Sequence, residues 1–218
     1  MILEELDAQK LIISGVGVRE GTFLHDMLRN HRGKIPNDIN PSVKSLQDIF
    51  LTSVNDSRLI NRHNRVLFAL LKERFNLTRE HLIDLEIAGK LYNIGANFNF
   101  YQAHKHSAYI ALHSLNYGLS HRQRYTIATL LEYSHKKRPK DKDVRLLRLL
   151  PSSDILQILS FIFAISTSAA KDSEAEFHLS ENTLCIKTNR PSMVAILNDI
   201  TKPKLENGTL NLRVEYNG

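Results

Sequence analysis

The side chains that could do chemistry gather around the segment LYNIGANFNFYQAHKHS, residues 91–107. His104 and His106 flank a lysine at an expected helix start, and His63 and His135 lie on other expected helices. Neutral imidazoles that converge with carboxylates from separate helices can hold a divalent ion, which activates water for hydrolysis. These histidines therefore have the chemistry of the nitrogen ligands in a metal-dependent hydrolase site.

The carboxylate half of such a site is missing. In the frame of HD-type metallophosphohydrolases, a His-Asp pair occupies the place that Tyr92 and Asn93 take here. Tyrosine and neutral asparagine are poor ligands for a divalent ion. A late helix offers Asp154, but at its start rather than in its middle. We therefore expect no bound metal and no catalytic residue in this chain. Tyr92 and Asn93 are instead expected to supply a packed ring and an internal hydrogen bond, and His63 to be structural.

Positive charge is concentrated in one part of the chain. The net charge is +6, while residues 101–150 alone carry +7, which leaves the remainder at −1. The segment holds ten basic residues, Lys105, Arg122, Arg124, Lys136, Lys137, Arg138, Lys140, Lys142, Arg145 and Arg148, and three acids, Glu132, Asp141 and Asp143. A concentrated field of this kind favours a polyanionic partner.

This basic segment comprises two helix starts, one near His104 and one at Ser120, and a loop at 135–142. Basic side chains near a helix N-terminus oppose the helix dipole by about 0.3–1 kcal/mol each, and a bound anion relieves that cost. Ser120 is the expected N-cap of the second start. The alternative interpretation of the loop is a solvated Lys/Arg run that caps the end of the preceding helix and binds no anion. The predicted phosphate contacts are His104, Lys105, His106, Arg122, Arg124, His135, Lys136, Lys137, Arg138 and Lys140.

Bulk properties are those of an ordinary globular protein. The 218 residues are 42% hydrophobic and 24% charged, which allows a sizeable core. Cys185 is the single cysteine, so there is no internal disulfide and no cysteine-based zinc site, and we expect it to be a small core residue. The N-terminus does not look like a signal peptide, and the apolar run at 155–165 is too short to span a bilayer. We expect a cytoplasmic protein without membrane contact.

Hydrophobic periodicity predicts a mainly α fold, an HD-domain-like helical bundle with a short α/β piece at the N-terminus and a small α+β C-terminal subdomain. The first piece comprises a helix at 1–9, a strand at 10–17 and a helix at 19–31, followed by a linker at 33–41. The bundle helices are expected at 42–54, 56–75, 79–91, 104–117, 120–135, 143–149 and 152–168. The tail is expected to form a hairpin at 175–188, a helix at 191–200 and a strand at 208–216.

Two segments carry a family resemblance. LIISGVGVREGTFLHDML, residues 11–28, resembles the LxVSxxGxREG segment that closes the actin-like phosphatase domain of the Ppx/GppA family. Residues 91–137 resemble the HD-like helical domain of the same family. The matching positions are Ile94, Gly95, His104, Lys105, His106, Ser107, Ala108, Tyr109, Ser120, Ile127, Ala128, Tyr133, His135 and Lys137. The chain departs from the family pattern at two places. Tyr92-Asn93 stands where the family has a His-Asp or His-Glu pair, and His121, Arg122 and Arg124 stand where acidic residues are common in the family.

The resemblance implies the C-terminal portion of an exopolyphosphatase or guanosine pentaphosphate phosphohydrolase. Residues 1–33 would end an actin-like (ribonuclease H-like) lobe, residues 42–170 would form the HD-like domain, and residues 171–218 a small subdomain. The family's Gly-rich phosphate turn and Mg²⁺-holding acids are not found here, so the catalytic lobe and its Mg²⁺ are expected to lie in a missing N-terminal domain. This chain alone would then be inactive, would guide polyphosphate or guanosine pentaphosphate, and would form a homodimer.

Two alternatives stay open from the sequence. One is a non-enzymatic, degenerate HD-like module that binds a nucleotide alarmone, nucleic acid or a protein partner. Few aromatic residues accompany the basic loop, which speaks against single-stranded RNA. The other is a self-sufficient HD hydrolase with altered metal ligands.

Overall fold

The computed structural model describes residues 5, 7, 17–31, 40–50, 53–135, 149–201 and 210–216 of the chain. The chain divides into two compact units, residues 1–39 and 40–218, and each is described by itself. In the first unit, α2 (Val18–Met27) is followed by η1 (Arg29–His31), which confirms the helix predicted over 19–31. The helix predicted at 1–9, the strand at 10–17 and most of the linker at 33–41 lie outside the described residues.

The second unit begins with helices, as predicted. They are α3 (Pro41–Ile49), α4 (Val54–Leu71), α5 (Arg79–Leu91), η3 (Ile94–Asn97), η4 (Phe100–Gln102), α6 (Ala103–Ser114), α7 (His121–Glu132) and α8 (Ser153–Ala169). Several of these helices end a few residues earlier than the periodicity suggests. For example, α4 ends at Leu71, and Asn76 adopts a left-handed backbone with φ of 50° in the turn that follows. The helix predicted over 143–149 falls mainly outside the described residues.

Capping residues explain where the helices begin. The Asn40 side chain accepts hydrogen bonds from Ser42 N (3.0 Å) and Val43 N (3.2 Å), and Pro41 occupies the first turn of α3. Both features are favoured at helix starts, because a capping oxygen satisfies backbone donors that have no partner in the helix. Ser120 is the N-cap of α7, as predicted, and it forms a capping box with Gln123.

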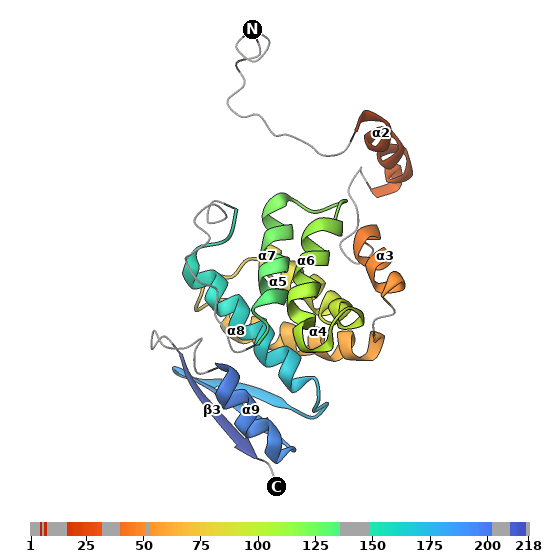
Figure 1. Ribbon diagram of the computed structural model, residues 1–218. Helices are drawn as coiled ribbons and strands as arrows, with labels where there is room; N and C mark the ends of the chain where they lie inside the picture. The colour runs from red at the N-terminus through yellow and green to blue at the C-terminus, as the bar shows by residue number, and fades with distance from the viewer. Residues whose placement is uncertain are drawn as a thin grey trace. The chain divides into compact units, whose positions relative to one another are not determined.

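The core of this unit is centred on α8. Its residues from Ile158 to Ala169 are all buried, so this helix is apolar around most of its circumference and is covered by neighbours. It packs against α4, α5 and α7, and in Figure 1 it passes behind the green pair of helices α6 and α7. Within the described part of the chain, no helix combines the length and apolarity that crossing a membrane requires.

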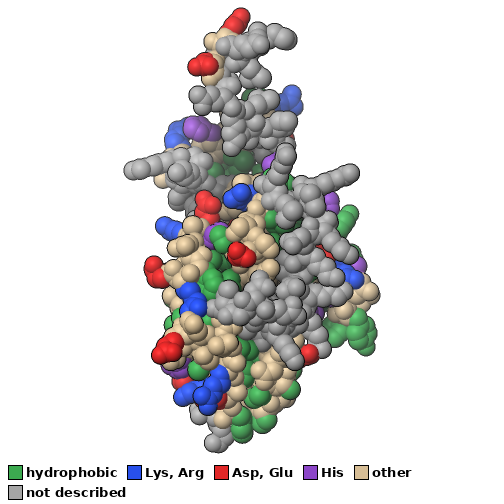
Figure 2. Space-filling view, turned by 90° about the vertical axis from the view of Figure 1, so that its left-hand side faces the viewer, with side chains coloured by type: hydrophobic (Ala, Val, Ile, Leu, Met, Phe, Trp, Pro, Cys, Tyr) green, Lys and Arg blue, Asp and Glu red, His purple; other side chains and the backbone are tan. Residues whose placement is uncertain are grey.

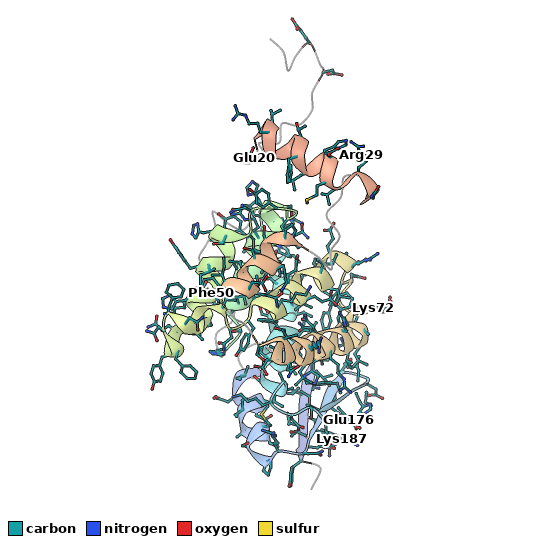
Figure 3. The ribbon with its side chains drawn as sticks, turned by 90° about the vertical axis from the view of Figure 1, so that its right-hand side faces the viewer. Glu20, Arg29, Phe50, Lys72, Glu176 and Lys187 are labelled. Atoms are coloured by element: carbon teal, nitrogen blue, oxygen red, sulfur yellow. The ribbon has the colours of Figure 1, made fainter. Side chains whose placement is uncertain are left out.

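A small α+β piece completes the unit. It contains β1 (Glu176–Ser180), β2 (Thr183–Thr188), α9 (Pro191–Thr201) and β3 (Asn211–Tyr216). The strand order is β1-β2-β3, with β1 antiparallel to β2 and β3 parallel to β2, and α9 lies on the connection between the parallel strands. Glu176 and Lys187 face each other in the hairpin register and are labelled in Figure 3. The predicted hairpin, helix and final strand are confirmed.

Alternation along β2 decides which side chains enter the core. Leu184 and Ile186 are fully buried, whereas Cys185 points to the other face and is only half-buried. The expectation that Cys185 belongs to the core is therefore wrong, although its place on a strand is correct. The buried cluster runs from Val43 to Leu210, so the helices and the sheet share one core. The fold is mainly helical with a small α+β piece, as expected, while the predicted boundaries at 33, 42 and 171 stay predictions.

Candidate functional site

Hydrogen bonds join the segment between α5 and α6 to Ser107, near the start of α6. The Ser107 hydroxyl accepts a hydrogen bond from Gly95 N (2.9 Å) and donates one to the Tyr92 carbonyl (3.1 Å). A Cβ atom at Gly95 would lie 2.3 Å from the Ala103 carbonyl oxygen and 2.4 Å from Ser107 N. Only glycine allows the backbone to approach this closely, so Gly95 and Ser107 together determine how η3 meets α6.

Tyr92 faces the interior. Its ring lies 6.1 Å from that of Phe163, nearly perpendicular at 78°. Burial raises the pKa of the Tyr92 hydroxyl, and a hydrogen bond with Thr167 opposes that rise. The predicted packed ring is thus confirmed. Asn93 is exposed, so the expectation of an internal side chain is wrong at this position, where the chain turns into η3.

The histidines on α6 separate into two environments. The rings of His104 and His135 have centroids 4.9 Å apart. His106 instead stacks with Phe98, with centroids 6.0 Å apart and an interplanar angle of 27°. This division follows from helix geometry, because residues two apart point to different sides of a helix. Lys105, between them, is exposed.

His104 and His135 both line a cavity of about 740 Å³. Its walls come from α4, α5, η3, η4, α6 and the C-terminal end of α8. The charged lining residues that the structure describes are Lys90, Lys171 and Asp56. Phe50, labelled in Figure 3, lies at the end of α3 and also lines the cavity. Cationic and imidazole groups therefore outnumber acids at this position.

Two further predicted phosphate contacts, Arg122 and Arg124, lie at the opposite end of the α6–α7 pair. A short connection makes these two helices antiparallel, and Figure 1 shows them side by side. At that end Arg124 Nη2 donates to the Leu112 carbonyl (2.6 Å), near the C-terminus of α6, while Arg122 is exposed. A helix of 12 residues is about 18 Å long, so the two groups of basic residues are separated by about that distance.

Four predicted contacts cannot be placed. Lys136, Lys137, Arg138 and Lys140 lie outside the described residues. On the face of the second unit drawn in Figure 2, coloured Lys and Arg side chains are interspersed with Asp and Glu. The described part of that face therefore carries no large patch of one sign, and the cavity is the stronger candidate for binding an anion.

His63 is not among the residues that line the cavity. Its side chain is 2% exposed, and its ring centroid is 5.2 Å from that of Phe177 on β1. Burial lowers the pKa of His63, and Arg62 acts in the same direction, while the Ser166 backbone opposes the shift. Neither ring nitrogen makes a hydrogen bond of ordinary geometry. These surroundings agree with the structural role expected for His63.

Among the candidate metal ligands, His104 and His135 lie together, but Asp154 does not join them. Asp154 is exposed in the first turn of α8, whereas Thr167 and Lys171, at the other end of that helix, line the cavity. Asp154 and Thr167 are 13 positions apart in α8, which corresponds to about 20 Å. Among the residues that the structure describes, no group of three or more His, Cys, Asp or Glu side chains is placed to hold a metal ion.

Sequence reasoning missed several residues that line the cavity. Lys90 directly precedes the segment 91–107 and could have been found by its position. The sequence around Lys171 and Asp56 does not indicate that they line the cavity, because they come from the end of α8 and the start of α4, far from the segment 91–107. Phe100 and Tyr101 were visible as part of an aromatic run, without any indication of where their rings would face.

Comparison with known proteins agrees with this architecture. No curated protein matches the chain. A family model described as Ppx/GppA phosphatase, domain III, matches residues 39–190. The match covers more than two thirds of the chain and includes α3 to α8 and the β1–β2 hairpin. The chain therefore belongs to the Ppx/GppA phosphatase family, and its second unit contains domain III.

Proposed function

We propose that this chain binds the phosphate-rich substrate of a phosphohydrolase, either polyphosphate or guanosine pentaphosphate, and guides it toward a catalytic lobe. The observation that carries the proposal is the composition of the 740 Å³ cavity, where Lys90, Lys171, His104 and His135 gather against the single described acid Asp56. Hydrolysis, its Mg²⁺ and the homodimer are predictions from the family.

The chemistry of the cavity suits direct recognition of phosphate. Lysine ammonium groups are compact point charges that bind phosphate oxygens without a bridging metal. His104 also lies in the first turn of α6, where backbone N–H groups and the helix dipole favour an anion. Asp56 lies in the first turn of α4, where the same dipole effect stabilises its own charge.

Binding of medium-chain polyphosphate, measured by calorimetry without metal at about 50 mM and about 200 mM salt, tests the proposal. We expect the affinity to fall at the higher salt and to fall about tenfold or more in Lys90→Ala/Lys171→Ala, since two cationic contacts are lost. Lys72→Ala is the matched control, because Lys72 is exposed at the end of α4, away from the cavity. Undiminished binding by the double variant would contradict the proposal, as would no binding by the unmutated chain at low salt.

Ligand length tests whether both basic ends of the α6–α7 pair take part. A polyphosphate long enough to cover about 18 Å should bind more weakly to Arg122→Ala, whereas tripolyphosphate should not be affected. Equal affinities of the variant and the unmutated chain for the long ligand would confine binding to the cavity end.

A further inference from the structure

A second, smaller groove lies between α3 and α4. Both helices pack against α5, and the groove between them has a volume of about 460 Å³. Its lining residues on the two helices are Lys44, Gln47 and Asp48 on α3 and Val54, Ser57, Arg58, Asn61 and Arg65 on α4. They recur at the three- and four-residue spacing of a single helix face. The stripe from Val54 to Arg65 covers 11 positions of α4, or about 16 Å, so this α3–α4 groove is elongated.

Buried hydrogen bonds hold the base of the α3–α4 groove. Asn61 is 7% exposed; its Nδ2 donates to the Glu86 carbonyl (3.1 Å), and its Oδ1 accepts from Asn64 Nδ2 (3.2 Å). A Cβ atom at Gly89 would lie 2.2 Å from Asn61 Oδ1, so only glycine allows α4 and α5 to approach this closely. The groove is therefore part of the packed structure and needs no ligand to form it.

Positive charge dominates the lining of the groove. The lining contains one acid, Asp48, and four cations, Lys44, Arg58, Arg65 and Lys90. Lys44 Nζ pairs with Asp48 (2.5 Å), and Arg65 Nε pairs with Glu86 (2.5 Å). Within the part of the chain that the structure describes, no acid pairs with the side chain of Arg58 or Lys90. These two cations are therefore available to a negatively charged partner.

We propose that the α3–α4 groove binds a short acidic peptide segment of a partner protein, with side-chain carboxylates at Arg58 and Lys90. A guanidinium group binds a carboxylate through two parallel hydrogen bonds, and opposite charges that meet across an interface select the partner. The length of about 16 Å corresponds to about five residues of extended peptide. The proposal does not rest on the proposed function, because the ligand differs and Arg58 lines only this groove.

Other lining groups favour a peptide over a phosphate chain. Val54 is 57% exposed, so it offers an apolar contact to a peptide side chain. Gln47 Nε2 donates to the Lys90 carbonyl (3.4 Å), which leaves Gln47 Oε1 to accept a hydrogen bond from a peptide N–H group. A phosphate chain has no apolar surface and presents mainly acceptors. Cations, an apolar side chain and an acceptor along one groove together match an acidic peptide.

Fluorescence anisotropy with fluorescein-labelled hexaglutamate, on the full chain at about 50 mM salt, tests the proposal. Labelled hexaglutamine is the uncharged probe. The test variant is Arg58→Glu, and Arg79→Glu is the matched control, because Arg79 is exposed at the start of α5 and does not line the groove. Lys171→Ala reports on the larger cavity. Arg58 and Arg79 are both exposed, so both variants should fold like the unmutated chain.

We expect Arg58→Glu to bind hexaglutamate about tenfold or more weakly, and Arg79→Glu and Lys171→Ala to bind it like the unmutated chain. Tripolyphosphate should bind equally to Arg58→Glu and the unmutated chain, and hexaglutamine should not bind. Equal binding of hexaglutamate by Arg58→Glu and the unmutated chain would overturn the proposal, as would no binding at low salt or equal binding of hexaglutamine.

Two other results would also overturn the proposal. A larger loss of hexaglutamate binding in Lys171→Ala than in Arg58→Glu would place the peptide in the larger cavity. A similar loss of tripolyphosphate and hexaglutamate binding in Arg58→Glu would make the groove a general anion site. The two proposals are separable, because a chain that binds hexaglutamate but not polyphosphate would contradict the proposed function alone.

Discussion

Asp84 provides a sharp test of the packing between α5 and α7. Its side chain is 3% exposed, and its Oδ1 atom makes no hydrogen bond. Burial raises the pKa of this carboxyl to about 8; a hydrogen bond from Gln123 opposes the rise, and repulsion by Glu80 adds to it. Gln123 Oε1 accepts from Ser120 N (3.1 Å), so the amide NH₂ group is the donor left for Asp84. The carboxyl is therefore mostly protonated at neutral pH.

The sign and size of the effect follow from proton linkage. Between the ordinary pKa of 3.8 and the folded value of about 8, the unfolded chain has released a proton that the folded chain retains. The free energy of unfolding therefore falls as the pH rises through this window and is constant above it. One pKa unit corresponds to about 1.4 kcal/mol, so raising the pH from 5 to 8 should cost about 3–4 kcal/mol. Asp84→Asn keeps the shape of the protonated side chain and removes this cost.

Urea denaturation followed by circular dichroism at pH 5, 6, 7 and 8 measures the prediction for the wild type and Asp84→Asn. Burial lowers the pKa of His63 and His81, so their contribution to stability is lost below about pH 6.5 in both proteins and cancels in the difference. We expect that difference to grow by about 3–4 kcal/mol in favour of the variant as the pH rises. A constant difference would refute the reasoning. Asp48→Asn, which changes an exposed carboxyl on α3, is the control.

Three further predictions concern the stability of the fold. Gly95→Ala should cost about 1–3 kcal/mol of unfolding free energy and weaken polyphosphate binding, since its Cβ atom would meet the backbone of α6. Asp172→Asn should cost about 1.5–3 kcal/mol in urea denaturation. Burial by itself would raise the pKa of Asp172, but hydrogen bonds from Thr188 Oγ1 (2.6 Å), Glu174 N and Asn189 N outweigh burial and hold the pKa below its ordinary value of 3.8. The stability advantage of the wild type should therefore be full above pH 3.8 and be lost as the pH falls through the folded pKa. His63→Leu should be more stable than the wild type at pH 5, measured by thermal unfolding, because position 63 then has no imidazole that protonates in the unfolded chain.

Local sequence was sufficient for most helices and for the hairpin. Apolar periodicity and capping residues such as Asn40 and Ser120 act within a few positions of the chain, so they can be interpreted without knowledge of the fold. The replacement of a His-Asp pair at Tyr92-Asn93 is likewise visible in the sequence, and Tyr92 packs inside as expected. Helix ends were less accurate, because turns such as that at Asn76 depend on backbone conformations that many residues can adopt.

The grouping of the basic residues was decided by tertiary structure alone. His104 and Arg124 are close in sequence, yet the antiparallel pairing of α6 and α7 places them at opposite ends of a helix pair. The same packing brings Lys90 and Lys171, which are far apart in the chain, to the lining of one cavity. Composition and periodicity along the chain determined that this protein is mainly helical, with its positive charge concentrated in residues 101–150. Which side chains face one another depended on helix packing, because contacts between distant segments are set by the shared core around α8 and leave no local pattern in the sequence.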